Sequence, residues 1–141
     1  MLSNIDLRLI RRGLVNILYD RQAEVKRPIS LVLAECKTTE EIQATIESFR
    51  KSRNEYAIRR DAVNGLGFQF LLDKKRDMGL AVLEFNAGEH PHSPWVYESL
   101  AEAYIMAGNR EKAIGNLQKV LKIDPQNIYA KEKLEELNKK K

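Results

Sequence analysis

The stretch "SPWVYESLAEAYIMAGN", residues 93–109, decides the fold. Ser93 is of a type that caps helix N-termini, and Pro94 suits a first helical turn, where a missing N–H costs nothing. Apolar residues then recur at three- and four-residue steps and form one stripe: Val96 or Tyr97, Leu100, Ala101, Tyr104 and Ile105. Gly108 suits the left-handed turn that stops a helix. The stretch therefore predicts an amphipathic helix that ends in a tight turn.

A second helix follows at once. Asn109 is a capping residue, and Asp124-Pro125 closes the segment. The apolar face between them consists of Ala113, Leu117, Val120 and Leu121. Residues 94–127 are therefore predicted to form an antiparallel helix hairpin.

The hairpin has a second copy. Residues 60–93 align with residues 94–127 without a gap, and six apolar, small or proline positions match. The pairs are Leu66/Leu100, Gly67/Ala101, Phe70/Tyr104, Gly79/Ala113, Leu83/Leu117 and Pro91/Pro125. A period of 34 with this pattern resembles the tetratricopeptide repeat, a helix-turn-helix unit that stacks into a right-handed solenoid. Small residues at 67, 101 and 113 suit a close approach of paired helices.

Three flanking segments complete the predicted domain organisation. Residues 128–141 form a capping helix and basic tail, with Leu134 and Leu137 inward. Residues 28–59 form a degraded helical hairpin, in which a Thr38–Glu41 capping box precedes an apolar stripe of Ile42, Ile46 and Phe49. Residues 1–27 form an N-terminal amphipathic helix and a polar linker; the apolar face of that helix is Leu7, Ile10, Leu14 and Ile17. The expected fold is all-α, with about seven helices.

Composition agrees with such a fold and narrows the function classes. Of the 141 residues, 43% are hydrophobic and 31% are charged, which is typical of a globular protein. The net charge of +4 comes from scattered basic groups without interleaved aromatic residues, so nucleic-acid binding is not predicted. The chain has no apolar run long enough for a membrane span.

No catalytic, cofactor or metal site is predicted. His90 and His92 flank Pro91 at the seam between the two repeats, and we expect both in an exposed loop without further ligands for zinc. Cys36 lies in the apolar-rich stretch "SLVLAEC" and is expected to be a buried, inert thiol. Ser48-x-x-Lys51 fits the nucleophile motif of β-lactamase-type enzymes only formally, because the partner motifs are missing.

The resemblance to tetratricopeptide repeats implies a binding face. In that family the first helix of each pair lines the concave side of the solenoid. The corresponding residues here are Asn64, Phe68, Leu71, Trp95, Glu98, Glu102, Ile105, Met106 and Tyr129, with Asp61 and Leu72 beside them. This strip is apolar and edged with carboxylates, so it suits an apolar or amphipathic protein segment with some basic residues. The family's basic clamp for a C-terminal carboxylate is replaced by acidic residues.

A second resemblance gives the alternative function. The run of residues 4–33 followed by helical repeats is similar to the C-terminal end of serine hydrolases of the β-lactamase and penicillin-binding-protein type. That similarity implies an accessory region that docks or dimerises a catalytic domain absent from this sequence. The sequence thus leaves open an external partner, a catalytic domain of the same parent chain, a homodimer, or a strip covered within the chain. If Met1 is the natural start, we expect a cytoplasmic protein. If the sequence is the tail of a secreted hydrolase, we expect an extracytoplasmic one.

Overall fold

The computed structural model describes residues 26–139, and this part of the chain is all-α, as the sequence predicts. Its helices are α2 (Ile29–Ala34), α3 (Thr39–Lys51), α4 (Arg60–Leu72), α5 (Arg76–Glu89), α6 (Pro94–Met106), α7 (Arg110–Ile123) and α8 (Ile128–Lys139). The amphipathic helix predicted within residues 1–27 lies outside the described residues, and so does most of the 4–33 stretch.

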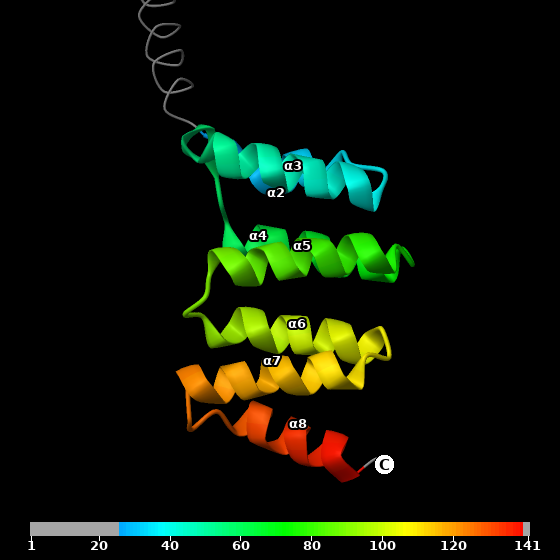
Figure 1. Cartoon of the computed structure of the whole chain (residues 1–141), viewed down its shortest axis with the longest axis vertical. Helices are drawn as coiled ribbons and strands as arrows, with labels where there is room; N and C mark the ends of the chain where they lie inside the picture. The colour runs from blue at the N-terminus through cyan, green and yellow to red at the C-terminus, as the bar shows by residue number, and fades with distance from the viewer. Residues whose placement is uncertain (1–25, 140–141) are drawn as a thin grey trace, which may run out of the picture.

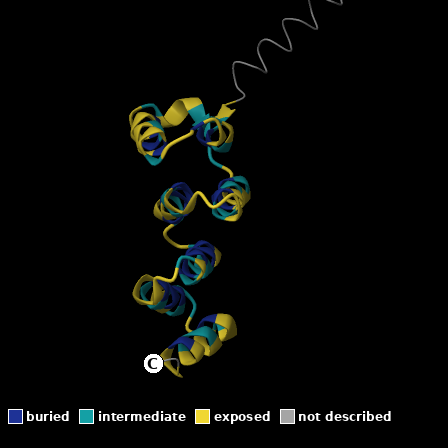
Figure 2. Cartoon of the chain, turned by 90° about the vertical axis from the view of Figure 1, so that its right-hand side faces the viewer, coloured by how far each residue is buried: buried dark blue, intermediate teal, exposed yellow. Residues whose placement is uncertain are grey.

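The helices stack along one axis in two layers (Figures 1 and 2). Helices α2, α4, α6 and α8 form one layer, and α3, α5 and α7 form the other. Each of the pairs α4–α5 and α6–α7 is an antiparallel hairpin with extensive contact along its length. No helix within residues 26–139 is long and apolar enough to cross a membrane.

The repeat period of 34 residues is also the number of residues that separates the equivalent ends of successive helices along the chain. Helix α6 (Pro94–Met106) begins and ends one period after α4 (Arg60–Leu72), and α7 begins and ends one period after α5. Helix α8 begins one period after α6 begins. Equivalent residues of the first helices therefore lie side by side in one layer, which is what positions the candidate surface.

Two glycines let α4 and α5 approach each other closely. A Cβ atom placed on Gly67 would lie 2.5 Å from Leu83 Cγ, and one on Gly79 would lie 2.7 Å from the Gly67 carbonyl oxygen. The equivalent positions of the next hairpin, Ala101 and Ala113, carry real Cβ atoms and are fully buried. The first hairpin is therefore packed more tightly at this crossing than the second.

The predicted helix ends are confirmed in part. Gly108 has a φ of +75° and terminates α6, and the Asn109 side chain accepts a hydrogen bond from the Lys112 amide at 3.1 Å. The Thr38 hydroxyl caps α3 by accepting from the Glu41 amide at 3.2 Å. Pro94 occupies the first turn of α6, but the Ser93 side chain makes no capping bond. It accepts from Arg60 Nη1 at 3.0 Å instead, so the predicted capping role of Ser93 is wrong.

The core has two continuous parts. One holds the inward faces of α5 to α8, with Leu100, Tyr104 and Leu117 among its buried residues. The other lies between α2, α3, α4 and α5 and includes the predicted α3 stripe of Ile42, Ile46 and Phe49.

A short parallel strand pairing joins the start of the described chain to the segment before α4. Strand β1 (Arg27–Pro28) pairs with β2 (Tyr56–Ala57), which follows the 3-10 turn η1 (Arg53–Glu55). The sequence did not predict this pairing. It places the beginning of the described chain beside α2, on the layer that also contains α4 and α6.

Candidate interaction surface

The large exposed apolar residues gather on one layer of the molecule. Within residues 26–139, all six belong to α2, α4, α6 and α8, and none to α3, α5 or α7. They are Leu31, Leu72, Trp95, Met106, Ile128 and Tyr129. Two pairs occupy equivalent repeat positions, since Met106 follows Leu72 by one repeat period and Tyr129 follows Trp95 by the same period. The exposed apolar side chains are therefore concentrated on this layer and are not scattered over the whole surface.

Trp95 and Met106 lie on the same side of α6. They are separated by about three helical turns, so their side chains project in nearly the same direction. Their exposed fractions are 39% for Trp95 and 50% for Met106. Tyr129 on α8 is exposed to 39% as well. We call the surface formed by Trp95, Glu98, Glu102, Met106 and Tyr129 the Trp95–Tyr129 face.

A guanidinium group covers part of the indole ring. Arg60 Cζ lies 5.2 Å from the centroid of the Trp95 ring, in cation–π geometry. The Arg60 side chain is held by its bond to Ser93, and the Arg60 carbonyl accepts from Asn86 Nδ2 at 3.0 Å. One part of the tryptophan is thus covered by Arg60 of α4, while 39% of the residue stays exposed to solvent.

The middle of the face is acidic. Glu98 Oε1 accepts from Asn127 Nδ2 at 2.7 Å, and Glu102 Oε2 accepts from the Tyr129 hydroxyl at 2.8 Å. Burial raises the pKa of Tyr129 well above its ordinary value, and the bond to Glu102 and the negative charges of Glu102, Glu98 and Glu136 raise it further. Glu136 also pairs with Lys133 at 3.2 Å. Carboxylates from two helices thus surround the tyrosine.

The other predicted binding residues serve mainly in the core. Phe68, Leu71 and Ile105 are partly buried and pack against the buried cluster of α5 to α8. Asn64 is only 8% exposed, and its Oδ1 has no hydrogen-bond partner among the described residues. Leu71 also lines, with Met106, a hollow of about 320 Å³ at the ends of α4 and α6. The structure thus brings the predicted row together but leaves only part of it accessible.

Sequence reasoning missed a groove on the opposite side. A hollow of about 460 Å³ lies between α5 and α7 and has Tyr97 and Tyr104 among its lining residues. Tyr104 donates a hydrogen bond to Glu84, and Lys112 Nζ lies 5.0 Å from the Tyr104 ring centroid. No periodic signal marks this groove, because its lining residues come from three helices.

The two histidines lie in different environments. His92 is exposed, as predicted, but His90 is half-buried with its Nε2 out of contact with solvent, so its predicted full exposure is wrong. Burial lowers the pKa of His90 below its ordinary value; the charge of Arg60 acts in the same direction, and that of Glu89 opposes it. Within residues 26–139, no three His, Cys, Asp or Glu side chains are grouped as a metal would require.

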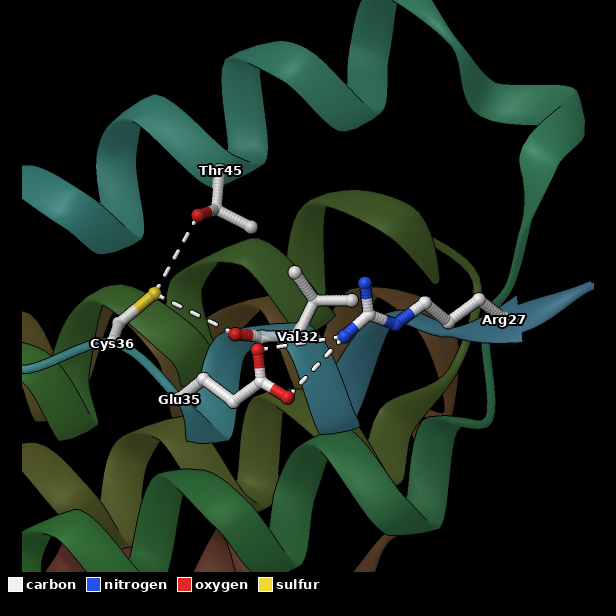
Figure 3. Close-up of polar contacts among 5 residues, drawn as sticks. All are labelled: Arg27, Val32, Glu35, Cys36 and Thr45. Atoms are coloured by element: carbon white, nitrogen blue, oxygen red, sulfur yellow. Dashed lines mark hydrogen bonds and ion pairs between the residues drawn. The ribbon is translucent and has the colours of Figure 1, made fainter.

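Cys36 is buried, as predicted (Figure 3). Its Sγ lies 3.5 Å from Thr45 Oγ1 and 3.7 Å from the Val32 carbonyl oxygen. The nearby Arg27–Glu35 ion pair, at 3.2 Å, is on the exposed side of α2. The sulfur therefore has a hydroxyl and a carbonyl as polar neighbours, and neither is a base that could activate it.

Comparison with known proteins adds no assignment, because no protein-family model and no curated protein sequence matches the chain.

Proposed function

We propose that the chain is a non-catalytic protein-interaction module of the tetratricopeptide-repeat type, a short right-handed solenoid that binds an apolar or amphipathic protein segment on its concave side. The single observation that carries the proposal is the confinement of all six exposed large apolar residues of the described chain to the α2/α4/α6/α8 layer. Exposed apolar patches bordered by polar groups are typical of interaction sites.

The ligand chemistry follows from the Trp95–Tyr129 face. Trp95, Met106 and Tyr129 offer apolar and aromatic contact area, and tryptophan and tyrosine are the residue types that most often dominate binding energy. Glu98 and Glu102 lie among them and favour a segment whose apolar side chains are flanked by arginine or lysine. The ligand class is therefore a basic amphipathic segment.

The test uses a designed 18-residue amphipathic peptide of leucine and arginine, with a leucine and glutamate peptide of equal length as its control. Trp95 is the only tryptophan, so its emission reports on the face in the full chain. We expect the arginine peptide to shift this emission and the glutamate peptide to leave it unchanged. The double substitution Glu98→Gln/Glu102→Gln should weaken binding about 2- to 30-fold, because each surface ion pair contributes about 0.2–1 kcal/mol.

The matched control variant is Glu111→Gln, which removes an exposed carboxylate from α7, in the other layer. It should bind the arginine peptide as the wild type does. Equal affinity for both peptides, or equal weakening by Glu111→Gln and Glu98→Gln/Glu102→Gln, would refute the proposed site. Trp95→Ala should also weaken peptide binding, measured by calorimetry, while the helical content stays near normal.

A further inference from the structure

The groove between α5 and α7 has the same lysine–tyrosine contact at two points along its length. Its floor belongs to α6, which packs against both helices; Figure 2 shows α5 and α7 in one layer and α6 in the other. Lys119 Nζ lies 5.3 Å from the centroid of the Tyr97 ring, and Lys112 Nζ lies 5.0 Å from that of the Tyr104 ring. The two lysines are seven residues apart in α7, and so are the two tyrosines in α6. The two contacts are therefore separated by about 10 Å along the groove.

The groove has an uncompensated positive charge at the Tyr97 contact. At the other contact, Glu84 lies 3.7 Å from Lys112 Nζ and accepts a hydrogen bond from the Tyr104 hydroxyl, so charges of both signs are paired there. Lys119 is exposed, and within residues 26–139 no carboxylate lies at ion-pair distance from it. A carboxylate of a ligand would supply the missing partner at this contact.

A buried amide lines the same groove between the two lysines of α7. Asn116 is only 7% exposed, and its Nδ2 donates to the Lys112 carbonyl at 2.8 Å. Its Oδ1 has no hydrogen-bond partner among the described residues. A buried acceptor without a partner costs free energy, which an N–H donor inside the groove would recover. Peptide backbones carry such donors along their whole length, so Asn116 and Lys119 together indicate a peptide with a carboxylate side chain.

The dimensions of the groove favour an extended peptide over a helix. Its volume of about 460 Å³, divided by the distance of about 10 Å between the two contacts, gives a mean cross-section of about 45 Å². An α-helix with its side chains has a cross-section of about 80–110 Å², whereas a strand in a packed sheet occupies about 48 Å². Gly88 and Gly115 line opposite rims, and an added Cβ at either would meet no atom within 4 Å. Helix packing requires neither glycine, and their small size lets a peptide backbone approach the rims closely.

We propose that the groove between α5 and α7 is a second binding site, which takes an extended acidic peptide segment of a partner protein. One carboxylate of the segment pairs with Lys119 beside Tyr97, and a backbone N–H donates to Asn116. A neighbouring apolar side chain lies on the floor that Tyr97 and Leu100 form. The site is in the layer opposite the Trp95–Tyr129 face and takes a ligand of opposite charge. The inference therefore goes beyond the proposed function and does not depend on it.

The experiment titrates the full chain by calorimetry with a nine-residue peptide of alternating valine and glutamate. A peptide of alternating valine and lysine is the control, and we expect only the glutamate peptide to bind. Binding should leave the emission of Trp95 unchanged, because Trp95 lies in the other layer.

A groove-filling variant tests the location of the site. Gly115→Leu places a large side chain in the groove and should abolish binding of the glutamate peptide. The matched control is Gly65→Leu in α4, where an added Cβ likewise meets no atom within 4 Å; it should bind the peptide as the wild type does. Leucine favours a helix more than glycine does, so circular dichroism and melting should show that both variants are folded.

A charge reversal tests the assigned contact while the groove stays open. Lys119→Glu should weaken binding of the glutamate peptide about 2- to 30-fold, because one surface attraction is lost and a repulsion of similar size is gained. The control is Lys122→Glu, which reverses an exposed charge of the same helix outside the groove and should change the affinity much less.

The inference and the proposed function fail in different experiments. Absence of glutamate-peptide binding to the folded wild type, equal binding of the lysine peptide, or undiminished binding to Gly115→Leu would overturn the groove site. Equal weakening by Lys119→Glu and Lys122→Glu would also overturn it. None of these results concerns the leucine–arginine peptide, whose binding tests the Trp95–Tyr129 face.

Discussion

Substitution of Gly79 by alanine should destabilise the protein although it improves helix propensity. Gly79 is in the middle of α5, where alanine is favoured over glycine by about 1 kcal/mol. In this structure an added Cβ would lie 2.7 Å from the Gly67 carbonyl oxygen and 2.8 Å from Leu71 Cγ. The nearest atom belongs to the backbone of α4, so rotation of a flexible side chain cannot relieve the contact. The two helices have to separate.

The size of the effect follows from these opposing contributions. Overpacking of a well-packed core costs typically about 1–3 kcal/mol, and a helix backbone that cannot yield locally places Gly79→Ala toward the upper part of that range. After the propensity gain of about 1 kcal/mol is subtracted, we expect a net loss of about 1–2 kcal/mol in the free energy of unfolding. For a chain of this size that corresponds to a decrease in Tm of very roughly 2–8 °C.

The matched control is Gly115→Ala in α7, where an added Cβ would meet no atom within 4 Å. This substitution should stabilise the protein by about 0.5–1 kcal/mol, because only the propensity term operates. Urea unfolding followed by circular dichroism measures both free energies with the same baseline. If Gly79→Ala proves as stable as Gly115→Ala, the close approach of α4 and α5 at Gly67 and Gly79 is refuted.

Two further predictions concern a titrating side chain and a helix end. The pKa of His90 is lowered in the folded state, so its contribution to stability is present above the unfolded value of about 6.5 and is lost as the pH falls through the folded value. The difference in Tm between about pH 7.5 and pH 5.5 should therefore be smaller in His90→Gln than in the wild type. An unchanged difference would contradict the burial of Nε2. Arg110 Nε donates to the Leu137 carbonyl at 2.8 Å, so Arg110→Met should release the end of α8 and accelerate hydrogen exchange of its amides while the amides of α4 keep their rates. Lys122→Met, which removes an exposed cation from the same helix α7 as Arg110, is the control, and equal acceleration in both variants would argue against that bond.

The sequence was sufficient to predict features that depend on local spacing. The repeat period predicted the order of helices α4 to α8, and Gly108 and Asn109 predicted the boundary between α6 and α7. The apolar stripe of Ile42, Ile46 and Phe49 likewise predicted the buried face of α3. Such features depend on backbone preference and on repetition of one helix face, and both are visible in a single stretch of chain.

Features that depend on partners from neighbouring helices were not predictable in this way. The Ser93 hydroxyl accepts a hydrogen bond from Arg60, 33 positions away in the sequence, instead of capping its own helix. The same arginine lies against the Trp95 ring. His90 is half-buried although its sequence neighbours are loop-forming residues, and the charges of Arg60 in α4 and Arg53 in η1 act on it. Periodicity shows which face of a helix is buried, but it does not show which side chain will occupy a gap between helices.

The position of α6 explains why only a narrow strip of its surface stayed exposed. Helix α6 contacts α4, α5 and α7, so residues around most of its circumference are buried, including Val96, Leu100 and Tyr104. A helix enclosed in this way has only a narrow strip left for solvent, and packing alone would favour polar residues along that strip. Trp95 and Met106 occupy it nonetheless, beside Glu98 and Glu102. Because their exposed parts add little to the stability of the fold, the proposed binding of a protein segment rests on these residues, and the leucine–arginine peptide tests it.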